Sequence, residues 1–306
     1  MPFIKLGLLG LRLLTAFLIT VCVSFAQGLP ETDIFVGTLS RTGDGYTVDS
    51  LKNLTHRPGY DNQPFFLPDG ESFLFTEYLT DQSDIFRCYV QNDSIVRITD
   101  TKVSEYSPTV MPSGEYFSVI RVEKDSTQRL WKFPLREDGT PSILLERVKP
   151  VGYQGWIDSV TVGLFILGDT NTLHIANIRT QKDEKLPGEI GRSIQKIPNR
   201  KTVSFVRKDS SNEWWITEYD PAAKTTRRLI RTLPARDLFA WTPDGAVLMG
   251  DSSKLYYWKS GSEPSWTLLA DCSRWGISEI SRIAVSPGGG RIAVVGIPVN
   301  QVKSKK

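Results

Sequence analysis

The alternation of apolar and polar residues is clearest at residues 60–75, where two short apolar segments flank the tripeptide Pro68-Asp69-Gly70. Proline presets the backbone angle that a turn requires, aspartate can bond to its own backbone, and glycine accepts a positive φ. Apolar segments of this length on both sides of such a turn are typical of β-strands. The pattern therefore predicts a β-hairpin.

The same hairpin pattern recurs along the chain. Residues 106–117 repeat it closely, and residues 240–245 repeat it again. With weaker copies included, the turn positions are residues 68, 112, 157, 198, 243 and 287. Successive copies are therefore 41 to 45 residues apart. A period in this range, with four short strands in each unit, is typical of a β-propeller.

Strand patterns between the turns predict five complete blades and two half-blades. The chain begins with an outer pair of strands at 33–39 and 46–55, and it ends with an inner pair at 280–286 and 291–297. Joined together, these pairs complete a sixth blade and leave no open strand edge. We therefore predict an all-β fold, a closed six-bladed β-propeller of four-stranded blades over residues 27–298. The complete blades are expected at 56–100, 101–148, 149–187, 188–234 and 235–271.

The first repeat resembles a known family. Its Leu54-Thr55 is followed by an Asp-x-x-Pro-x-Phe-x-Pro-Asp-Gly segment at 61–70 and then by Asp84-Ile85-Phe86. This pattern is similar to the repeats of TolB-like six-bladed propellers of the bacterial envelope, and also to the propeller half of prolyl oligopeptidases. The resemblance covers residues 31 to 298 and weakens in the third blade. It implies a propeller of the Gram-negative envelope, without room for the additional α/β domain that precedes the propeller of TolB itself.

The N-terminus has the pattern of a secretory signal peptide. Lys5 and Arg12 precede an apolar run at 13–23, and Ser24-Phe25-Ala26 places small residues at the cleavage positions. We expect residues 1–26 to be removed, so that the mature chain begins at Gln27 in the periplasm or outside the cell. A transmembrane anchor and a lipoprotein site at Cys22 are the alternatives. After cleavage we expect no membrane span, and residues 299–306 form a charged tail.

Composition narrows the classes of partner. The chain is 40% hydrophobic and 23% charged, as in soluble globular proteins. Its formal net charge of +3 falls to about +1 when Lys5 and Arg12 are subtracted. A nearly neutral protein has no electrostatic reason to bind nucleic acid or an anionic membrane. We expect a monomer, in which Cys88 and Cys272 either pair or, as we favour, are two small buried hydrophobic residues.

Motifs for enzymatic chemistry are missing from the sequence. It has no Gly-x-Ser-x-Gly nucleophile motif, no phosphate-binding glycine pattern and no Cys-x-x-Cys pair. Its only histidines are His56 and His174, which stand far apart and outside any metal-binding spacing. We therefore predict no cofactor and no metal.

Three acidic residues are candidates for a catalytic role, so an enzyme is the alternative function. Asp61, Glu105 and Asp237 each stand six or seven residues before the turn of a blade, where the chain enters the innermost strand. Equivalent positions in a ring face the same funnel, so these acids could converge as in a glycosidase or lyase. We favour a role in turn or rim structure for these acids, with contact to a ligand or partner as the next alternative.

Positions at similar offsets, or next to a turn, supply further candidate residues. Aromatic Tyr153 and Trp156 flank the irregular turn of the third blade, and core packing is the alternative for Trp156. The complete predicted rim of the funnel is Asp61, Asn62, Glu105, Tyr106, Tyr153, Trp156, Arg192, Arg236 and Asp237. This mixture of acids, bases and aromatics favours a binding scaffold without catalytic activity, for an envelope protein, a peptide or a glycan. A carbohydrate-active or small-molecule enzyme that uses the funnel acids is the alternative.

Overall fold

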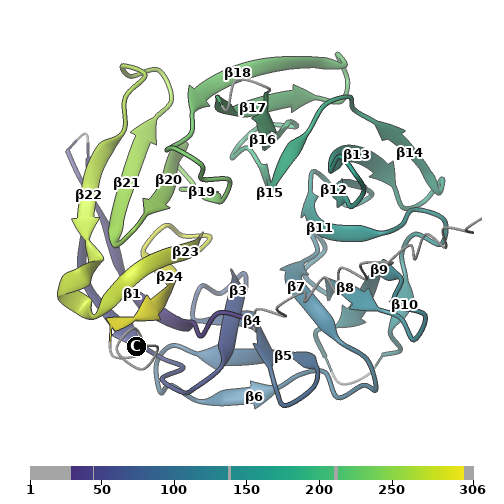
Figure 1. Ribbon diagram of the computed structural model, residues 1–306, viewed down its shortest axis with the longest axis horizontal. Coiled ribbons are helices and arrows are strands. Elements are labelled where there is room, and N and C mark those ends of the chain that lie inside the picture. Colours follow the sequence, from purple (N-terminus) through teal and green to yellow (C-terminus); the bar gives the residue numbers. More distant parts are fainter. Residues whose placement is uncertain (1–28, 44, 137–138, 210–212, 300–306) are drawn as a thin grey trace, which may run out of the picture.

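The computed structural model describes residues 29–43, 45–136, 139–209 and 213–299. In this part of the chain 24 strands form six antiparallel sheets of four strands each. The sheets stand in a ring, with one edge strand of each toward the centre (Figure 1). The predicted all-β, six-bladed propeller is therefore confirmed. The predicted signal peptide and residues 300–306 of the predicted tail lie outside the described residues.

In the five complete blades the strands follow chain order from the centre outward, within the predicted ranges. The first three blades consist of β3 (Tyr60–Phe66), β4 (Ser72–Tyr78), β5 (Ser83–Tyr89) and β6 (Ile95–Arg97); β7 (Glu105–Val110), β8 (Tyr116–Val122), β9 (Gln128–Pro134) and β10 (Ser142–Ile143); and β11 (Val151–Trp156), β12 (Thr161–Ile166), β13 (Thr172–Asn177) and β14 (Lys182–Lys185). The next two consist of β15 (Ile190–Lys196), β16 (Val203–Lys208), β17 (Trp214–Asp220) and β18 (Thr225–Arg231); and β19 (Phe239–Trp241), β20 (Ala246–Asp251), β21 (Lys254–Lys259) and β22 (Thr267–Asp271).

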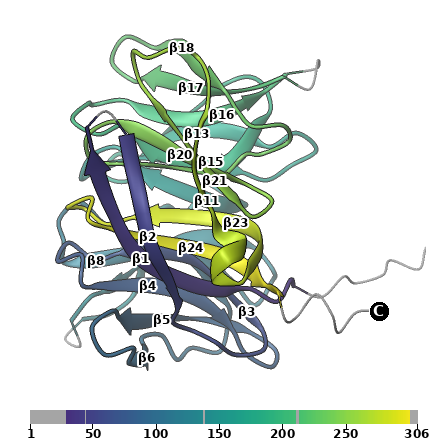
Figure 2. The same cartoon turned by 90° about the vertical axis from the view of Figure 1, so that its left-hand side faces the viewer.

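The sixth blade joins both ends of the described chain. A short 3-10 helix, η1 (Cys272–Trp275), leads into β23 (Ile277–Val285) and β24 (Arg291–Pro298). Strand β24 pairs with β1 (Asp33–Thr42), which pairs with β2 (Gly45–Asn53) at the outside. The β1–β24 ladder runs from Asp33 opposite Gly296 to Thr38 opposite Arg291, and Figure 2 shows β1 beside β24. The predicted closure of the ring is therefore confirmed.

Each innermost hairpin turn contains an equivalent backbone hydrogen bond. Its position shows that the predicted turn of the third blade must be moved by one residue. In the first blade the Leu67 amide donates to the Ser72 carbonyl at 2.8 Å. In the third blade the Ile157 amide donates to the Thr161 carbonyl at 3.0 Å. Ile157 thus corresponds to Leu67, and Asp158 occupies the position of Pro68. The predicted turn at 157 was one residue early because this turn has no proline to mark it.

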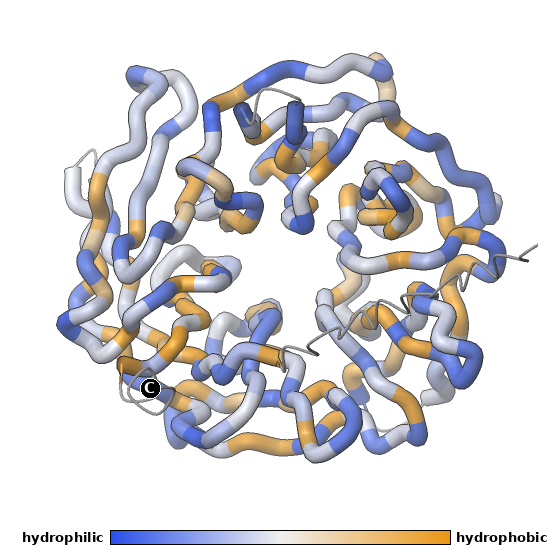
Figure 3. The backbone as a smooth tube through the Cα atoms, in the orientation of Figure 1, coloured by the Kyte–Doolittle hydropathy of each residue, from blue (hydrophilic) through white to orange (hydrophobic). Residues whose placement is uncertain are grey.

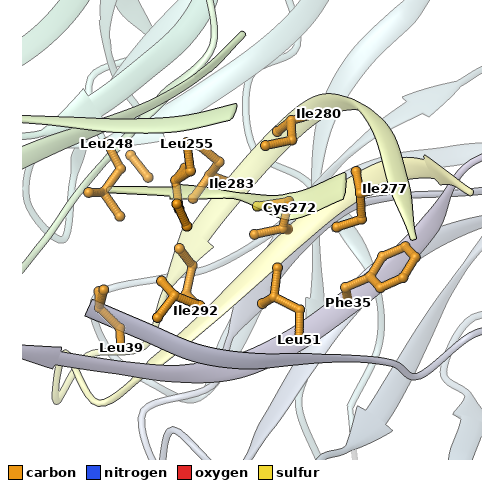
Figure 4. Close-up of a cluster of buried hydrophobic side chains, with 14 residues drawn as sticks. Phe35, Leu39, Leu51, Leu248, Leu255, Cys272, Ile277, Ile280, Ile283 and Ile292 are labelled. Carbon is orange, nitrogen blue, oxygen red and sulfur yellow. The ribbon is translucent and has the colours of Figure 1, made fainter. Parts of the chain in front are cut away.

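Apolar side chains fill the space between neighbouring blades. Figure 3 shows hydrophobic positions recurring within each blade, as expected for strands with two buried faces. One cluster lies between the fifth blade and the closing blade, where Leu248 and Leu255 meet Phe35, Leu51 and Ile283 (Figure 4). Large flat contacts of this kind hold the ring together because burial of apolar surface is the main favourable contribution to folding.

The two cysteines among the described residues, Cys88 and Cys272, are free and buried. Cys272 belongs to the cluster between the fifth and sixth blades, whereas Cys88 belongs to a separate cluster around Phe73 and Phe75. The interpretation as two small buried hydrophobic residues therefore fits the structure. Burial raises the pKa of both thiols to about 12, which keeps them protonated and unreactive. Within the described ranges, no helix is long and apolar enough to cross a bilayer.

Candidate functional site

Two cavities follow the axis of the ring. The wide cavity has a volume of about 580 Å³ and is lined by the innermost strands of all six blades. The narrow cavity, of about 350 Å³, is lined by five blades and by Leu29 and Pro30. Both cavities share Tyr153, Arg192, Arg282 and Ile283, which we call the waist. The cavities are therefore two halves of one channel that meet at the waist.

Irregularities in the innermost strands place side chains in this channel. The strand register shifts between Asn62 and Phe65 in β3, and between Tyr106 and Thr109 in β7. At these bulges Gln63 and Ser107 adopt positive φ angles of 60° and 54°. Strands β11, β15 and β23 also shift register close to waist residues. A bulge re-aims the side chains around it, so the waist is built from local departures from regular pairing.

Several predicted rim residues do meet in the channel. Asn62, Tyr153, Arg192, Arg236 and Asp237 line the narrow cavity. Tyr153 and Arg192 also line the wide cavity, together with Trp156. Six of the nine predicted residues, from four blades, therefore surround one channel.

Asp61, Glu105 and Tyr106 line neither cavity, which corrects the expected convergence of the acids. Successive side chains of a strand point to opposite faces, so Asp61 points away from the cavity that Asn62 lines. The fully buried Asp61 carboxylate accepts a hydrogen bond from Arg57 Nε at 3.1 Å. The guanidinium of Arg57 also forms an ion pair with Glu77. Asp61 therefore belongs to a partly buried ionic network within the first blade.

Glu105 is also fully buried. Thr101 Oγ1 donates to its Oε1 at 2.6 Å, and Arg121 Nε lies 3.7 Å from the same oxygen. Its second oxygen, Oε2, has no hydrogen-bond partner among the described residues. Burial raises the pKa of Glu105 to about 7, and the nearby donors offset only part of this effect.

Two aromatic candidates, Tyr106 and Trp156, pack against the apolar core between blades. Tyr106 contacts the apolar cluster between the second and third blades, and Trp156 belongs to that cluster with only 5% of its surface exposed. The Trp156 indole N–H donates to Ser118 Oγ of the second blade at 2.9 Å. Trp156 therefore offers the channel an edge and no open ring face.

Arg192 and Asp237 form an ion pair that joins the fourth and fifth blades. Arg192 Nη2 lies 2.8 Å from Asp237 Oδ1, and the Arg192 backbone amide donates to Oδ2 at 3.1 Å. Burial opposes ionisation of Asp237, but the hydrogen bonds and charge of Arg192 outweigh it and lower the pKa of Asp237. Gly191 permits this approach, because a Cβ there would lie 2.6 Å from the Cβ of Asp237. Asp237 therefore neutralises the charge of Arg192, whose side chain is exposed at the channel.

Arg236 is also paired. Its Nη2 lies 2.7 Å from Asp251 Oδ1, and its Nη1 lies 3.5 Å from Glu279 Oε1. The carboxylates among the described residues that line the channel are Asp237 and Glu279, and an arginine binds each of them. The part of the chain that the structure describes contains no cluster of metal-ligating side chains. His174 lies on β13, where it contacts Asp183 of β14 at 2.6 Å.

Sequence reasoning missed Gln63, Ser107 and Arg282, and also Tyr60 and Gln154. The first three stand five residues before the turn positions Pro68, Pro112 and Pro287. Tyr153 has the same offset once the turn of its blade is placed at Asp158. An offset one residue shorter would therefore have collected the polar residues that line the channel.

No family model matches the chain. A search of curated proteins finds an uncharacterised protein of Agrobacterium fabrum, 33% identical over 95 residues. That match covers 30% of this chain and 32% of the relative, so the chain spans about a third of the length of the curated relative it matches. This similarity carries no functional information of its own.

Solved structures share the fold. A protein from Agrobacterium tumefaciens assigned as a TolB superposes with a TM-score of 0.68 at 14% identity, over 88% of this chain and 99% of its own. TolB of Acinetobacter baumannii gives 0.56 at 12% identity, over 87% of this chain and 64% of its own. An oligogalacturonate lyase in complex with manganese gives 0.55 at 15% identity, over 83% of both chains. At these identities the likeness shows the fold, a TolB-like six-bladed propeller, and a fold shared by TolB proteins and a lyase does not by itself identify a function.

Proposed function

We propose that this protein is a non-catalytic binding propeller of the bacterial envelope, which recognises a partner protein or peptide at its central channel. The observation that carries the proposal is that the acidic side chains around the channel are either buried away from it or paired with arginines. Asp61 and Glu105 lie buried away from it, and Asp237 and Glu279 are bound to arginines. Hydrolysis of a glycosidic bond typically uses two carboxyl groups in reach of the substrate, and this arrangement of the acids supports binding instead.

The wide mouth of the channel supports recognition of a protein. Phe65 lines the wide cavity with 36% of its surface exposed, beside Pro64, Pro108 and Pro112. An exposed aromatic residue in a rim of rigid prolines is a suitable anchor for a partner side chain. The secretion pattern of residues 1–26 and the TolB-like fold favour an envelope location, periplasmic or secreted.

Affinity capture tests the proposal. The mature chain with a C-terminal tag is incubated with envelope extract of its native bacterium, beside the variants Phe65→Glu and Val96→Glu. Val96 is the matched control because it is an exposed apolar residue, at 48%, on the outermost strand β6. We expect a specific partner to co-elute with the parent and with Val96→Glu but not with Phe65→Glu.

The competing result is catalysis. A screen with polysaccharide and peptide substrates that found turnover, abolished in folded Asp237→Asn or Glu279→Gln, would replace the binding scaffold with an enzyme. Equal capture by all three proteins would instead move the binding surface away from the channel.

A further inference from the structure

Two buried polar atoms in the wall of the wide cavity have no hydrogen-bond partner among the described residues. They are Gln154 Oε1 and Ser107 Oγ, and both residues are 8% exposed. The Gln154 amide nitrogen donates to the Ser107 carbonyl at 2.7 Å, which orients the amide and leaves its oxygen as a free acceptor. Buried polar groups are nearly always satisfied in folded proteins, so these atoms indicate a missing donor.

A cation without a carboxylate partner stands at the waist. Arg282 Nε donates to Asn62 Oδ1 at 3.3 Å, and its guanidinium carbon lies 5.3 Å from the centre of the Tyr153 ring. Among the described residues no carboxylate lies within ion-pair distance of Arg282, in contrast to Arg192. Its terminal nitrogens therefore remain available to an anion that enters the channel.

The charge balance of the wide cavity favours an anion. Its charged lining residues are Lys196, Arg282 and the Asp237-paired Arg192, and no carboxylate among the described residues lines it. On the narrow side of the waist, burial raises the pKa of Tyr60 to about 12, so its hydroxyl stays protonated and can donate to an anion. A carboxylate at the waist would meet a planar guanidinium, the geometry that binds carboxylates best.

Part of the wall above the waist is apolar. Phe65, Pro108, Pro112 and Val285 line the wide cavity, and prolines have no amide N–H to offer a ligand. The aromatic residues there do not form a sugar platform, because Trp156 and Trp241 are 5% and 9% exposed. Their indole N–H groups already donate to Ser118 and Ser204. The walls therefore suit an aliphatic or aromatic side chain better than a sugar ring.

We propose that the wide cavity binds the free C-terminal end of a polypeptide, an assignment that rests on the proposed binding function. The terminal carboxylate would pair with Arg282, an amide N–H of the last residues would donate to Gln154 Oε1, and an apolar last side chain would contact Phe65. A C-terminus combines these groups within one or two residues. An acidic side chain or a sugar acid supplies the charge without the neighbouring apolar side chain.

Fluorescence anisotropy with synthetic peptides tests this. The probe is a fluorescein-labelled pentapeptide of glycine, serine and alanine ending in phenylalanine, made with a free carboxylate and as its C-terminal amide. We expect the free acid to bind at least about tenfold more tightly than the amide, as loss of a charge-assisted hydrogen bond requires. Arg282→Met should weaken binding of the acid by about tenfold and remove the difference between the two peptides.

Matched variants distinguish a loss of peptide binding at the proposed site from effects of net charge and from misfolding. Arg147→Met removes one positive charge from an exposed position outside both cavities and should leave peptide binding unchanged. Ser107→Ala removes a hydroxyl that bonds to no described residue, so the fold should persist while peptide affinity falls. Circular dichroism confirms the fold of each variant.

Several outcomes would overturn the assignment. Equal affinity for acid and amide would exclude recognition of the carboxylate. No binding of either peptide at about 1 mM, with envelope capture still sensitive to Phe65→Glu, would leave the proposed function intact and refute the C-terminal ligand alone. Tighter binding of an oligogalacturonate than of the peptide acid would assign the cation to a sugar acid instead.

Discussion

The Arg192 guanidinium and the Asp237 carboxylate bridge the fourth and fifth blades, with Nη2 and Oδ1 2.8 Å apart at the lining of the channel. Asp237→Ala should therefore destabilise the ring by about 2 kcal/mol, since it leaves the Arg192 backbone amide and guanidinium without their shared acceptor. Urea unfolding of the single variants and of Arg192→Met/Asp237→Ala measures the coupling. The double variant should lose less stability than the two single losses added together.

The control for this pair is exposed. Glu184 lies on the outer strand β14 and Lys224 directly precedes β18, and their charged atoms are 2.8 Å apart with both side chains at least half exposed. Lys224→Met should change stability by less than about 0.5 kcal/mol. A loss as small for Asp237→Ala would contradict the structural role of the channel pair.

Stability should fall as the pH rises, through Glu105. Its folded-state pKa of about 7 lies above the ordinary value of 4.5, because burial disfavours the charged form. The contribution of this group is complete below 4.5 and is lost as the pH rises to about 7 and beyond. Glu105→Gln mimics the protonated form, so its stability relative to the parent should rise by about 2 kcal/mol between about pH 5 and pH 8. Thermal unfolding across this range measures it, and a constant difference would show that Glu105 is ionised in the folded protein.

The closing blade depends on Gly37. A Cβ at this position would lie 1.7 Å from the Ser50 carbonyl oxygen, where β1 and β2 shift register. Gly37→Ala should therefore cost at least about 2 kcal/mol and promote aggregation through an exposed strand edge. Gly288→Ala is the matched control in the same blade, because a Cβ on Gly288 would have no atom within 4 Å. Equal melting temperatures for the two variants would contradict the tight approach of β1 and β2.

The signal peptide makes a separate prediction. Cleavage after Ala26 gives a mature chain that begins at Gln27. Intact-mass measurement of the protein purified from its native envelope should give that start. Retention of residues 1–26, or a lipid on Cys22, would contradict it.

The fold could be predicted from sequence because its signals are local. The Pro68-Asp69-Gly70 turn and its copies mark each innermost hairpin, and the two half-blades can be recognised at opposite ends of the repeat. Where the local signal weakens, at Asp158, the prediction was one residue out.

The site could be predicted only in part, because an offset from a turn gives a height along the channel but not the direction of a side chain. The bulges at Gln63 and Ser107 change that direction. Asp61 and Glu105 precede these bulges, and the alternation of side chains along a strand points them into the protein although they have the expected offset. Arg282 has no carboxylate partner because no acidic side chain of another described blade lies near it. The sequence of one repeat does not reveal which side chains of other blades lie nearby.

The central claim, that a partner binds at the channel, is tested most directly by photo-crosslinking in the native envelope. Benzoylphenylalanine replaces Phe65 at the wide mouth or, as the control, Leu268 on the outer strand β22, which is 53% exposed. We predict a discrete crosslinked partner from position 65 and none from position 268. A crosslink from position 268 alone would contradict the claim and place the binding surface on the outer face of the propeller.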